Sequence, residues 1–450
     1  MKLIIMAMLL LFATDLAKAQ DTLNLSQAIE AALENNHQVK ISRIEQDKME
    51  NTATRGNAGL LPTLSINSDL TGSYSDLELT PGSFFQNLLR QEDGQSLSPG
   101  TILYDGVTAT GFNAGIGAQF VIFDGMKGRL RYQMLQAGSV MANLQYQSEM
   151  ENSILLITRS YIRAVSLQMA ITLKELALVQ SHDRYRIIEM RREYGQANEQ
   201  QLLQALVDLK SDSTEYRDLI VKYENAYRDL HTAIGWDNRE LFPLDEEFHQ
   251  TELPVYDEML NSMLENNTAL HVRERRIEQA QLDHKITRSN FMPTLTATAQ
   301  YGYNYLTASD GQFETQEQLG VMGGISLKIP LFTGGKNRTA SQNTKASLRQ
   351  EQIRYEESEQ QLRTQFDNTW QELLYLDNRL HTEKQNLHVY ERNFERARDS
   401  FERGLITGVE LRTAQISLQD ARLRLSDTEL QMKLAETNLF YLSGVLLMPD

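Results

Sequence analysis

The stretch FMPTLTATAQYGYNYL, Phe291–Leu306, differs in character from the sequence on both of its sides. From Leu295 onward every second residue is apolar or aromatic, namely Leu295, Ala297, Ala299, Tyr301, Tyr303 and Tyr305. The residues between them are polar or small, beginning with Thr294, Thr296 and Thr298. A strict period of two predicts a β-strand with one apolar and one polar face. The flanking sequence is charged and helical in pattern, so this strand is expected at the end of a long helix.

Three further stretches share this alternation: Thr63–Tyr74, Gly111–Phe123 and Leu319–Phe332. Each of the four strands is expected to be about ten residues long, the length of a tilted membrane-spanning β-strand. A soluble β-sandwich is the alternative interpretation. A sandwich would need more strands, and uninterrupted helices would hardly lead into it.

Helices are expected to dominate the rest of the chain. No proline falls between Gly100 and Phe242 or between Leu331 and Met448, and these intervals are rich in good helix formers. Full-length helices are predicted at about 126–194 and 335–403, each roughly 100 Å long at a rise of 1.5 Å per residue. Half-length helices are predicted near 25–60, 199–234, 254–291 and 409–443. Two half-length helices stacked end to end would match one full-length helix.

The chain is written twice. LENN occurs at Leu33–Asn36 and at Leu264–Asn267, and PTL follows both copies at one constant offset. Phe123–Arg129 (FDGMKGR) aligns with Phe332–Arg338 (FTGGKNR), and the same offset matches the pairs Gly195 with Gly404 and Gly235 with Gly444. Landmarks that keep register in this way indicate an internal duplication.

The duplication predicts the domain organisation. Residues 20–235 form a first copy and residues 254–450 a second, each in the order helix, strand, strand, long helix, helix. Residues 236–253 form a non-repeated equatorial linker. The strands are expected at one pole, the turns at Gly195 and Gly404 at the other, and the linker at mid-height.

The N-terminal segment predicts export. Residues 1–19 combine a basic Lys2, an apolar run and an Ala-x-Ala site before Gln20, as in a secretory signal peptide. A membrane anchor is the alternative, but the run is shorter than the ~20 residues that a span needs, and no later stretch is expected to span. The chain has no cysteine, which excludes disulfides and thiolate metal sites. Its formal net charge of −16 argues against nucleic-acid binding.

Four strands cannot close a barrel, because single-chain outer-membrane barrels begin at about eight strands. An open sheet edge in lipid would leave backbone groups unsatisfied, at several kcal/mol each. Several copies of the chain are therefore expected to pool their strands. The face of Tyr301, Tyr303 and Tyr305 would contact lipid, and the threonine face would line a lumen. One helical rod per strand would continue the barrel as a helical tube, which predicts an oligomeric duct.

These landmarks resemble the TolC-like outer-membrane efflux proteins, the outer membrane factors. The resemblance rests on the signal segment, the paired LENN and PTL motifs, the FDG and FTGG turns, and the G-x6-L-x2-A segments at Gly195–Ala205 and Gly404–Ala414. It implies a mixed α and β membrane protein, a homotrimer whose twelve-stranded outer-membrane β-barrel continues into a long periplasmic α-helical barrel of a Gram-negative cell. It also implies a periplasmic adaptor protein and an inner-membrane pump of RND or ABC type as partners, with small molecules as cargo.

The resemblance also implies site residues at the turns. Glu410 matches an acidic position where the periplasmic aperture narrows, and Thr413, Ile406 and Gln201 are expected beside it. Thr413 and Ile406 stand where some relatives carry a second acid and a basic gate residue. The turn tips expected to dock the adaptor are Gly195, Gln196, Ala197, Gly404 and Leu405.

A simpler interpretation of Glu410 is a helix cap. TGVE, Thr407–Glu410, has the form of a capping box, and so does NEQQ, Asn198–Gln201. Gly195 and Gly404 end their helices as left-handed glycine caps should.

No motif for catalysis, phosphate binding or a zinc protease is present, and the eight histidines lack paired ligand spacing. We therefore expect neither enzyme activity nor a metal or other cofactor. Two other functions stay open, a type I protein secretion duct of the same fold and a non-conducting structural or adhesive coiled-coil stalk.

Overall fold

The computed structural model describes residues 22–80, 102–237, 242–246, 248, 255–309 and 314–447. The expected signal segment, residues 1–19, lies outside this part, as does much of the expected linker. The chain divides into two compact units, each of which takes residues from both halves of the sequence. The sheet unit contains residues 50–138 and 278–349. The helical unit contains residues 139–277, 350–450 and the chain up to Met49.

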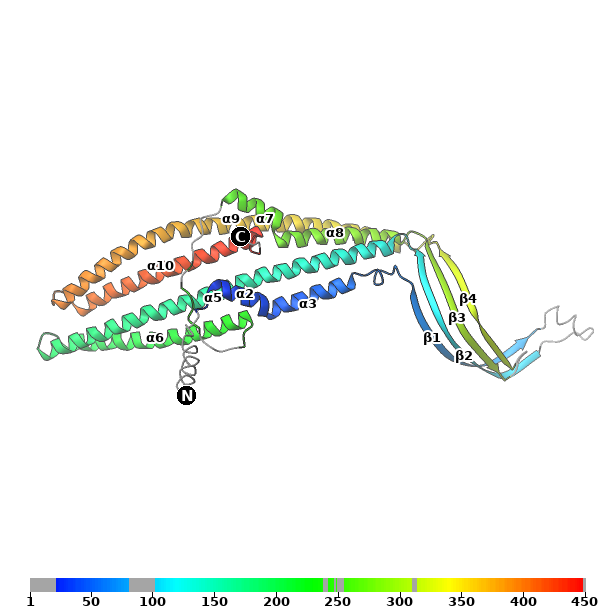
Figure 1. The fold of residues 1–450 in the computed structure, drawn as a ribbon, viewed down its shortest axis with the longest axis horizontal. Coiled ribbons are helices and arrows are strands. Elements are labelled where there is room, and N and C mark those ends of the chain that lie inside the picture. Colours follow the sequence, from blue (N-terminus) through cyan, green and yellow to red (C-terminus); the bar gives the residue numbers. More distant parts are fainter. Residues whose placement is uncertain are drawn as a thin grey trace, which may run out of the picture. The chain divides into compact units, whose positions relative to one another are not determined.

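The sheet unit is built on four antiparallel strands in sequence order (Figure 1). They are β1 (Thr63–Leu79), β2 (Ile102–Phe123), β3 (Thr294–Ala308) and β4 (Thr315–Lys328). Their register places Tyr301 between Ile116 and Val321 on one face, and Thr298 between Gln119 and Gly324 on the other. The predicted separation of apolar and polar faces is confirmed across all four strands.

The strands are longer than the ten residues expected, at 14 to 22 residues. The longest ladder joins β1 to β2 and continues to the pair Leu79 and Ile102. Beyond Tyr74, where the predicted strand ends, the ladder continues through Ser75 and, after a register shift, through Leu77. The alternation of apolar and polar residues therefore predicted the part of each strand with two distinct faces, which is shorter than the whole strand.

Two helical hairpins form most of the helical unit. One joins α5 (Lys127–Glu193) to α6 (Glu199–Ile234), and the other joins α9 (Lys336–Glu402) to α10 (Gly408–Ser443). These bounds agree with the predicted ones to within two residues. By length and composition alone α5 could cross a membrane, contrary to the expectation that no later stretch would qualify. Its Ile157, Tyr161 and Val165 are fully buried among other helices, as in a core helix.

The helices predicted as single elements near 25–60 and 254–291 each consist of two shorter helices. The first consists of α2 (Leu25–Asn35) and α3 (His37–Thr52), and the second of α7 (Tyr256–Asn266) and α8 (Thr268–Ser289). The break falls at Asn36 and Asn267, which have extended ψ values of 130° and 118°. Each side-chain oxygen accepts from backbone amides of the following helix, as an N-cap does. The second asparagine of LENN is therefore a helix breaker.

The same asparagines join the half-length helices. The side-chain amide of Asn36 donates to the carbonyl of Ala233 at 2.7 Å, and that of Asn267 donates to Leu442 at 2.8 Å. These carbonyls belong to the last turns of α6 and α10, which lack helical partners. The helices α6 and α10 therefore end at the breaks inside the predicted helices 25–60 and 254–291, and not at the ends of these helices, because α2 packs against α6 and α7 against α10.

The linker packs on one face of α5. Leu23 and Leu244 form a parallel bridge. The Tyr161 hydroxyl lies 2.7 Å from the Leu23 carbonyl oxygen and 2.9 Å from that of Asp245. Gln168, two turns further along α5, donates to the Leu244 carbonyl at 3.0 Å. These bonds fix both chain segments to the same helix face.

Two glycine substitutions test the junction. Gly195 and Gly235 have φ values of +71° and +86°, so alanine costs each of them roughly 1–2 kcal/mol of left-handed strain. An added Cβ at Gly195 meets no atom within 4 Å, whereas at Gly235 it lies 2.5 Å from the Asn35 carbonyl oxygen. We expect Gly235→Ala to lower the apparent midpoint of thermal unfolding, measured by circular dichroism, well below that of Gly195→Ala. Equal midpoints would show that the junction is not closely packed.

Candidate functional site

The candidate site begins at the turns of the two helical hairpins. Gly195 between α5 and α6, and Gly404 between α9 and α10, have φ values of +71° and +74°. The backbone amide after each glycine closes its helix end. The Gln196 amide donates to the Arg191 carbonyl at 2.7 Å, and the Leu405 amide donates to the Ser400 carbonyl at 2.9 Å. The predicted left-handed glycine caps are confirmed at both turns.

The two turns enclose a recess of about 360 Å³. Seven of the residues singled out from the sequence line it: Gln196, Ala197, Gln201, Gly404, Leu405, Ile406 and Glu410. Gly195 and Thr413 are not among its lining residues. Tyr301, Tyr303 and Tyr305 belong to the sheet unit, where they share the apolar face of β3.

Glu410 is exposed and acts as a helix cap. Its carboxylate accepts from the Thr407 amide at 2.7 Å and from the Thr407 hydroxyl at 2.9 Å, and these bonds lower its pKa. The capping interpretation is therefore confirmed. In the other hairpin Asn198 and the uncharged Gln201 form the same box. Thr413 directs its hydroxyl to the Val409 carbonyl of its own helix at 3.0 Å.

Arg191 ties the two turns together. Its guanidinium donates to the carbonyl of Phe401 at 2.6 Å and lies 4.6 Å from the centre of the Phe401 ring. The contact combines a charge-assisted hydrogen bond with a cation–π interaction. It joins the last turn of α5 to the last turn of α9.

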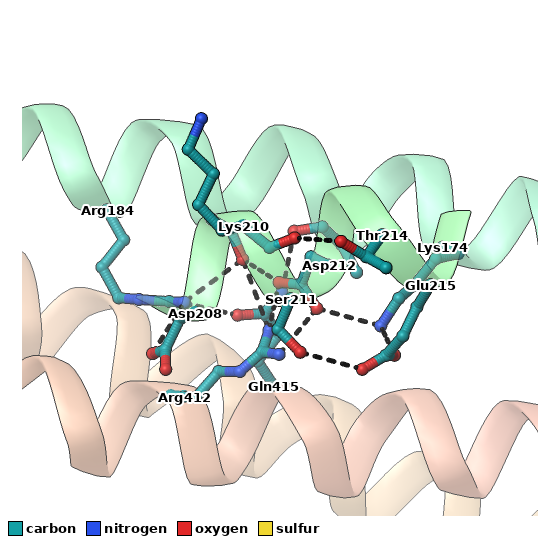
Figure 2. A network of polar contacts seen from close by, with 12 residues as sticks. Lys174, Arg184, Asp208, Lys210, Ser211, Asp212, Thr214, Glu215, Arg412 and Gln415 are labelled. Atoms are coloured by element: carbon teal, nitrogen blue, oxygen red, sulfur yellow. Dashed lines mark hydrogen bonds and ion pairs between the residues drawn. The ribbon is translucent and has the colours of Figure 1, made fainter. Parts of the chain in front are cut away.

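Above the recess a buried polar network joins α5, α6 and α10 (Figure 2). At its centre is Asp212 of α6, whose side chain is fully buried. Arg412 of α10 donates to both carboxylate oxygens of Asp212, at 2.7 Å each. Lys174 of α5 donates at 2.9 Å, and the Ser181 hydroxyl makes a further short bond. One carboxylate thereby connects both hairpins.

A second part of the network centres on Arg184 of α5, which is 2% exposed. It donates to the Gln415 side-chain oxygen on α10 at 2.6 Å and lies 3.4 Å from Asp208. Gln415 in turn donates to the Ala177 carbonyl of α5 at 3.2 Å. The buried cations thus have carboxylate or amide partners, as buried charges require.

Sequence reasoning missed this network, although a weak signal exists. Leu202, Ala205, Leu209 and Tyr216 recur at steps of three, four and seven on α6, and Asp212 occupies the remaining place in that seam. On α5, Lys174, Ser181 and Arg184 interrupt a seam in the same way. Polar residues at seam positions indicate a buried network, but the seam alone does not name their partners.

Asp212→Asn tests the network. Burial would raise the pKa of Asp212, but hydrogen bonds from Arg412, Ser181 and Lys174 outweigh it and hold the pKa below its ordinary value of about 4. Stability from the charged carboxylate is therefore present above about pH 4 and is lost as the pH falls through the lowered pKa. We expect a cost of about 3–5 kcal/mol at pH 7, because the substitution leaves buried cations without their carboxylate.

The matched control is Asp218→Asn on the same helix, whose carboxylate is exposed and lies 3.8 Å from Lys222. It should change stability by less than about 1 kcal/mol. Apparent unfolding temperatures of the detergent-extracted protein at several pH values measure both. An Asp212→Asn variant as stable as the wild type at pH 7 would contradict the assignment of a charged Asp212.

Comparisons with known proteins agree with this architecture. The sequence model of the outer membrane efflux protein family matches residues 28–236 and 259–445. The alkaline protease secretion protein AprF of Pseudomonas aeruginosa is 24% identical over 385 residues, covering 84% of this chain and 73% of AprF. The fold resembles that of the Campylobacter jejuni outer membrane channel CmeC, with a TM-score of 0.74, 15% identity and coverage of 96% and 88% of the two chains. It also resembles the Vibrio cholerae outer membrane protein VceC, with a TM-score of 0.72, 17% identity and coverage of 93% and 96%.

The match to the family model spans both halves of the sequence and takes in every described helix and strand except the first residues of α2 and α7. The chain therefore belongs to the outer membrane efflux protein family and is an outer-membrane efflux protein.

Proposed function

We propose that three copies of this chain form the exit duct of a tripartite efflux system for small molecules. The observation that carries the proposal is the sheet, which has one apolar and one polar face and ends in the edge strands β1 and β4. Three copies would pair these edges and close twelve strands, with Tyr301, Tyr303 and Tyr305 toward lipid. The fold resembles that of the outer membrane channel CmeC, and a periplasmic adaptor and an inner-membrane pump would be the partners of this duct. An RND or ABC pump in the inner membrane would supply the cargo.

The linker indicates which face of the helices lines the bore. It packs on the Tyr161 and Gln168 face of α5. A duct must keep its bore free, so we place this face outside. On α10, Glu410, Thr413, Asp427 and Gln431 fall on one heptad stripe that is exposed at each of these residues. We assign this stripe to the bore, which would bring three copies of Glu410 together around the axis.

The turns would serve as both gate and docking site. The tips at Gly195, Gln196, Ala197, Gly404 and Leu405 would receive the periplasmic adaptor; all of these residues are exposed except Ala197, which is half-buried. Opening requires the two hairpins to part at this end, so that the Arg191 contact and the Asp212–Arg412 ion pair must loosen or move together. The aperture would be lined by Glu410, Thr413, Ile406 and Gln201.

The proposed duct has a duplicated domain organisation and no catalytic activity. Residues 20–235 and 254–450 would be two copies of one ancestral unit joined by the linker 236–253, which follows a signal segment at 1–19. The asparagine junctions at Asn36 and Asn267 support the duplication. The duct would act by passage alone, with no catalytic residue and no cofactor.

One observation favours a second candidate. AprF is a secretion protein for alkaline protease, and its sequence matches over most of this chain. A type I protein secretion duct would use the same barrel and tube, with an ABC pump behind it. Export of a folded or unfolded protein, with no change in small-molecule efflux on deletion of the chain, would favour this candidate.

Cross-linking the turns tests the gate. The chain has no cysteine, so thiols introduced as Gln201→Cys and Ile406→Cys would be its only ones. Both positions line the recess between the turns. Complete cross-linking should stop dye efflux from cells while the trimer still assembles, and reduction should restore efflux. Unchanged efflux by the fully cross-linked protein would remove this end as the gate.

Glu410→Gln separates the pore role of Glu410 from its capping role. Glutamine keeps a hydrogen-bonding residue in the capping box and removes only the charge. Rings of acidic side chains favour cations in channels, so we expect the variant to lose cation preference and divalent-cation block in planar bilayers. The control is Glu199→Gln, an exposed acid in the first turn of α6 that pairs with Arg192. Wild-type selectivity in Glu410→Gln would leave Glu410 as a cap alone.

A further inference from the structure

A second recess lies between α5, α6 and α10, well away from the turns. Its volume is about 370 Å³. Ile162 of α5 together with Leu430 and Leu434 of α10 supplies an apolar floor. Arg159 and Arg163 of α5 and Lys222 of α6 line the same recess. The recess therefore combines an apolar floor with a cationic rim.

The charges of this rim are unbalanced. Arg159 and Arg163 are exposed and one helical turn apart, an arrangement in which like charges repel. Within the described residues neither guanidinium has a carboxylate partner. Lys222 has a distant one, Asp218 at 3.8 Å. The carboxylate among the lining residues is Asp427, which accepts from Gln431 at 2.6 Å. Three cations thus surround one anion that is already hydrogen-bonded.

Such a rim suits a negatively charged group. Guanidinium groups bind carboxylate and sulfonate through paired hydrogen bonds, and a cation shared with a ligand anion would relieve the repulsion between the two arginines. The volume is within the range of about 300–1,000 Å³ that small-molecule sites occupy. We propose that this recess binds amphipathic organic anions, whose apolar body covers Ile162, Leu430 and Leu434 while the anionic group meets Arg159 and Arg163.

The arginines of the recess lie on the side of α5 away from the face that we place outside the duct. Arg159 and Arg163 are each two residues from Tyr161, which is about 200° around a helix of 3.6 residues per turn. They therefore lie nearly opposite the face that the linker covers. Asp427 and Gln431 of α10 belong to the stripe that carries Glu410. This placement rests on the proposed function, and it makes the recess a contact site for anionic cargo within the duct.

Binding can be measured without transport. The wild-type trimer in amphipol would be titrated calorimetrically with 1-naphthalenesulfonate, 1-naphthalenemethanol and 1-naphthylmethylammonium, which share one apolar body. We expect saturable binding of the sulfonate, one per chain, at least tenfold tighter than that of the other two compounds. The double variant Arg159→Gln/Arg163→Gln should lose at least tenfold in affinity for the sulfonate and leave efflux of an uncharged dye intact.

The control is Arg228→Gln, an exposed arginine of α6 that pairs with Glu224 at 3.0 Å and should bind the sulfonate as wild type does. Equal affinity for the sulfonate and the ammonium compound, or unchanged sulfonate affinity in the double variant, would overturn the proposal. Loss of the trimer in the double variant, measured by light scattering, would also overturn it, because the arginines would then hold a neighbouring copy. Loss of sulfonate binding alone leaves the duct function untouched, and loss of efflux alone leaves the site untouched.

Discussion

The free backbone groups along the outer edges of β1 and β4 are the constraint on which the rest of this architecture depends. In lipid each unsatisfied amide or carbonyl costs several kcal/mol, so a four-stranded sheet cannot stand alone there. In the proposed duct, further copies of the chain supply the missing partners. The alternating faces of β3 and the four strands of one sheet then suit a closed assembly.

The helical unit meets a related demand by different means. The half-length helices α6 and α10 end among other helices, where the carbonyls of their last turns would lack hydrogen-bond donors. Asn36 and Asn267 satisfy a carbonyl of the arriving helix and amides of the departing one, and the left-handed Gly235 and Gly444 admit the neighbouring backbone closely. An asparagine at the break and a glycine at the arriving helix end therefore satisfy the backbone groups where the helices are interrupted.

Local patterns predicted what local physics decides. The alternation of apolar and polar residues predicted β3. The proline-free intervals predicted the bounds of α5 and α9 closely, and Gly195 and Gly404 predicted the turns that follow these helices. Asn36 was interpreted as part of a repeated motif and not as a helix break. An asparagine inside a helical pattern does not indicate which distant carbonyl, here that of Ala233, its side chain will bind. The Asp212 network was missed for the same reason, since Lys174 and Arg412 are brought to it only by tertiary packing. The hairpin end of β1 and β2 was underestimated because the register shifts between Ser75 and Leu77, which interrupts the alternation of apolar residues.

The bridge between Leu23 and Leu244 imposes an order on folding. Exported chains emerge N-terminus first, so Leu23 reaches the periplasm long before the segment that pairs with it. Until then the start of the chain has no docked position, and the Tyr161 hydroxyl that fixes it lacks both carbonyl partners. A contact between such distant parts of the sequence is slow to form. The contacts that fix the start of the chain to α5 therefore form late in folding.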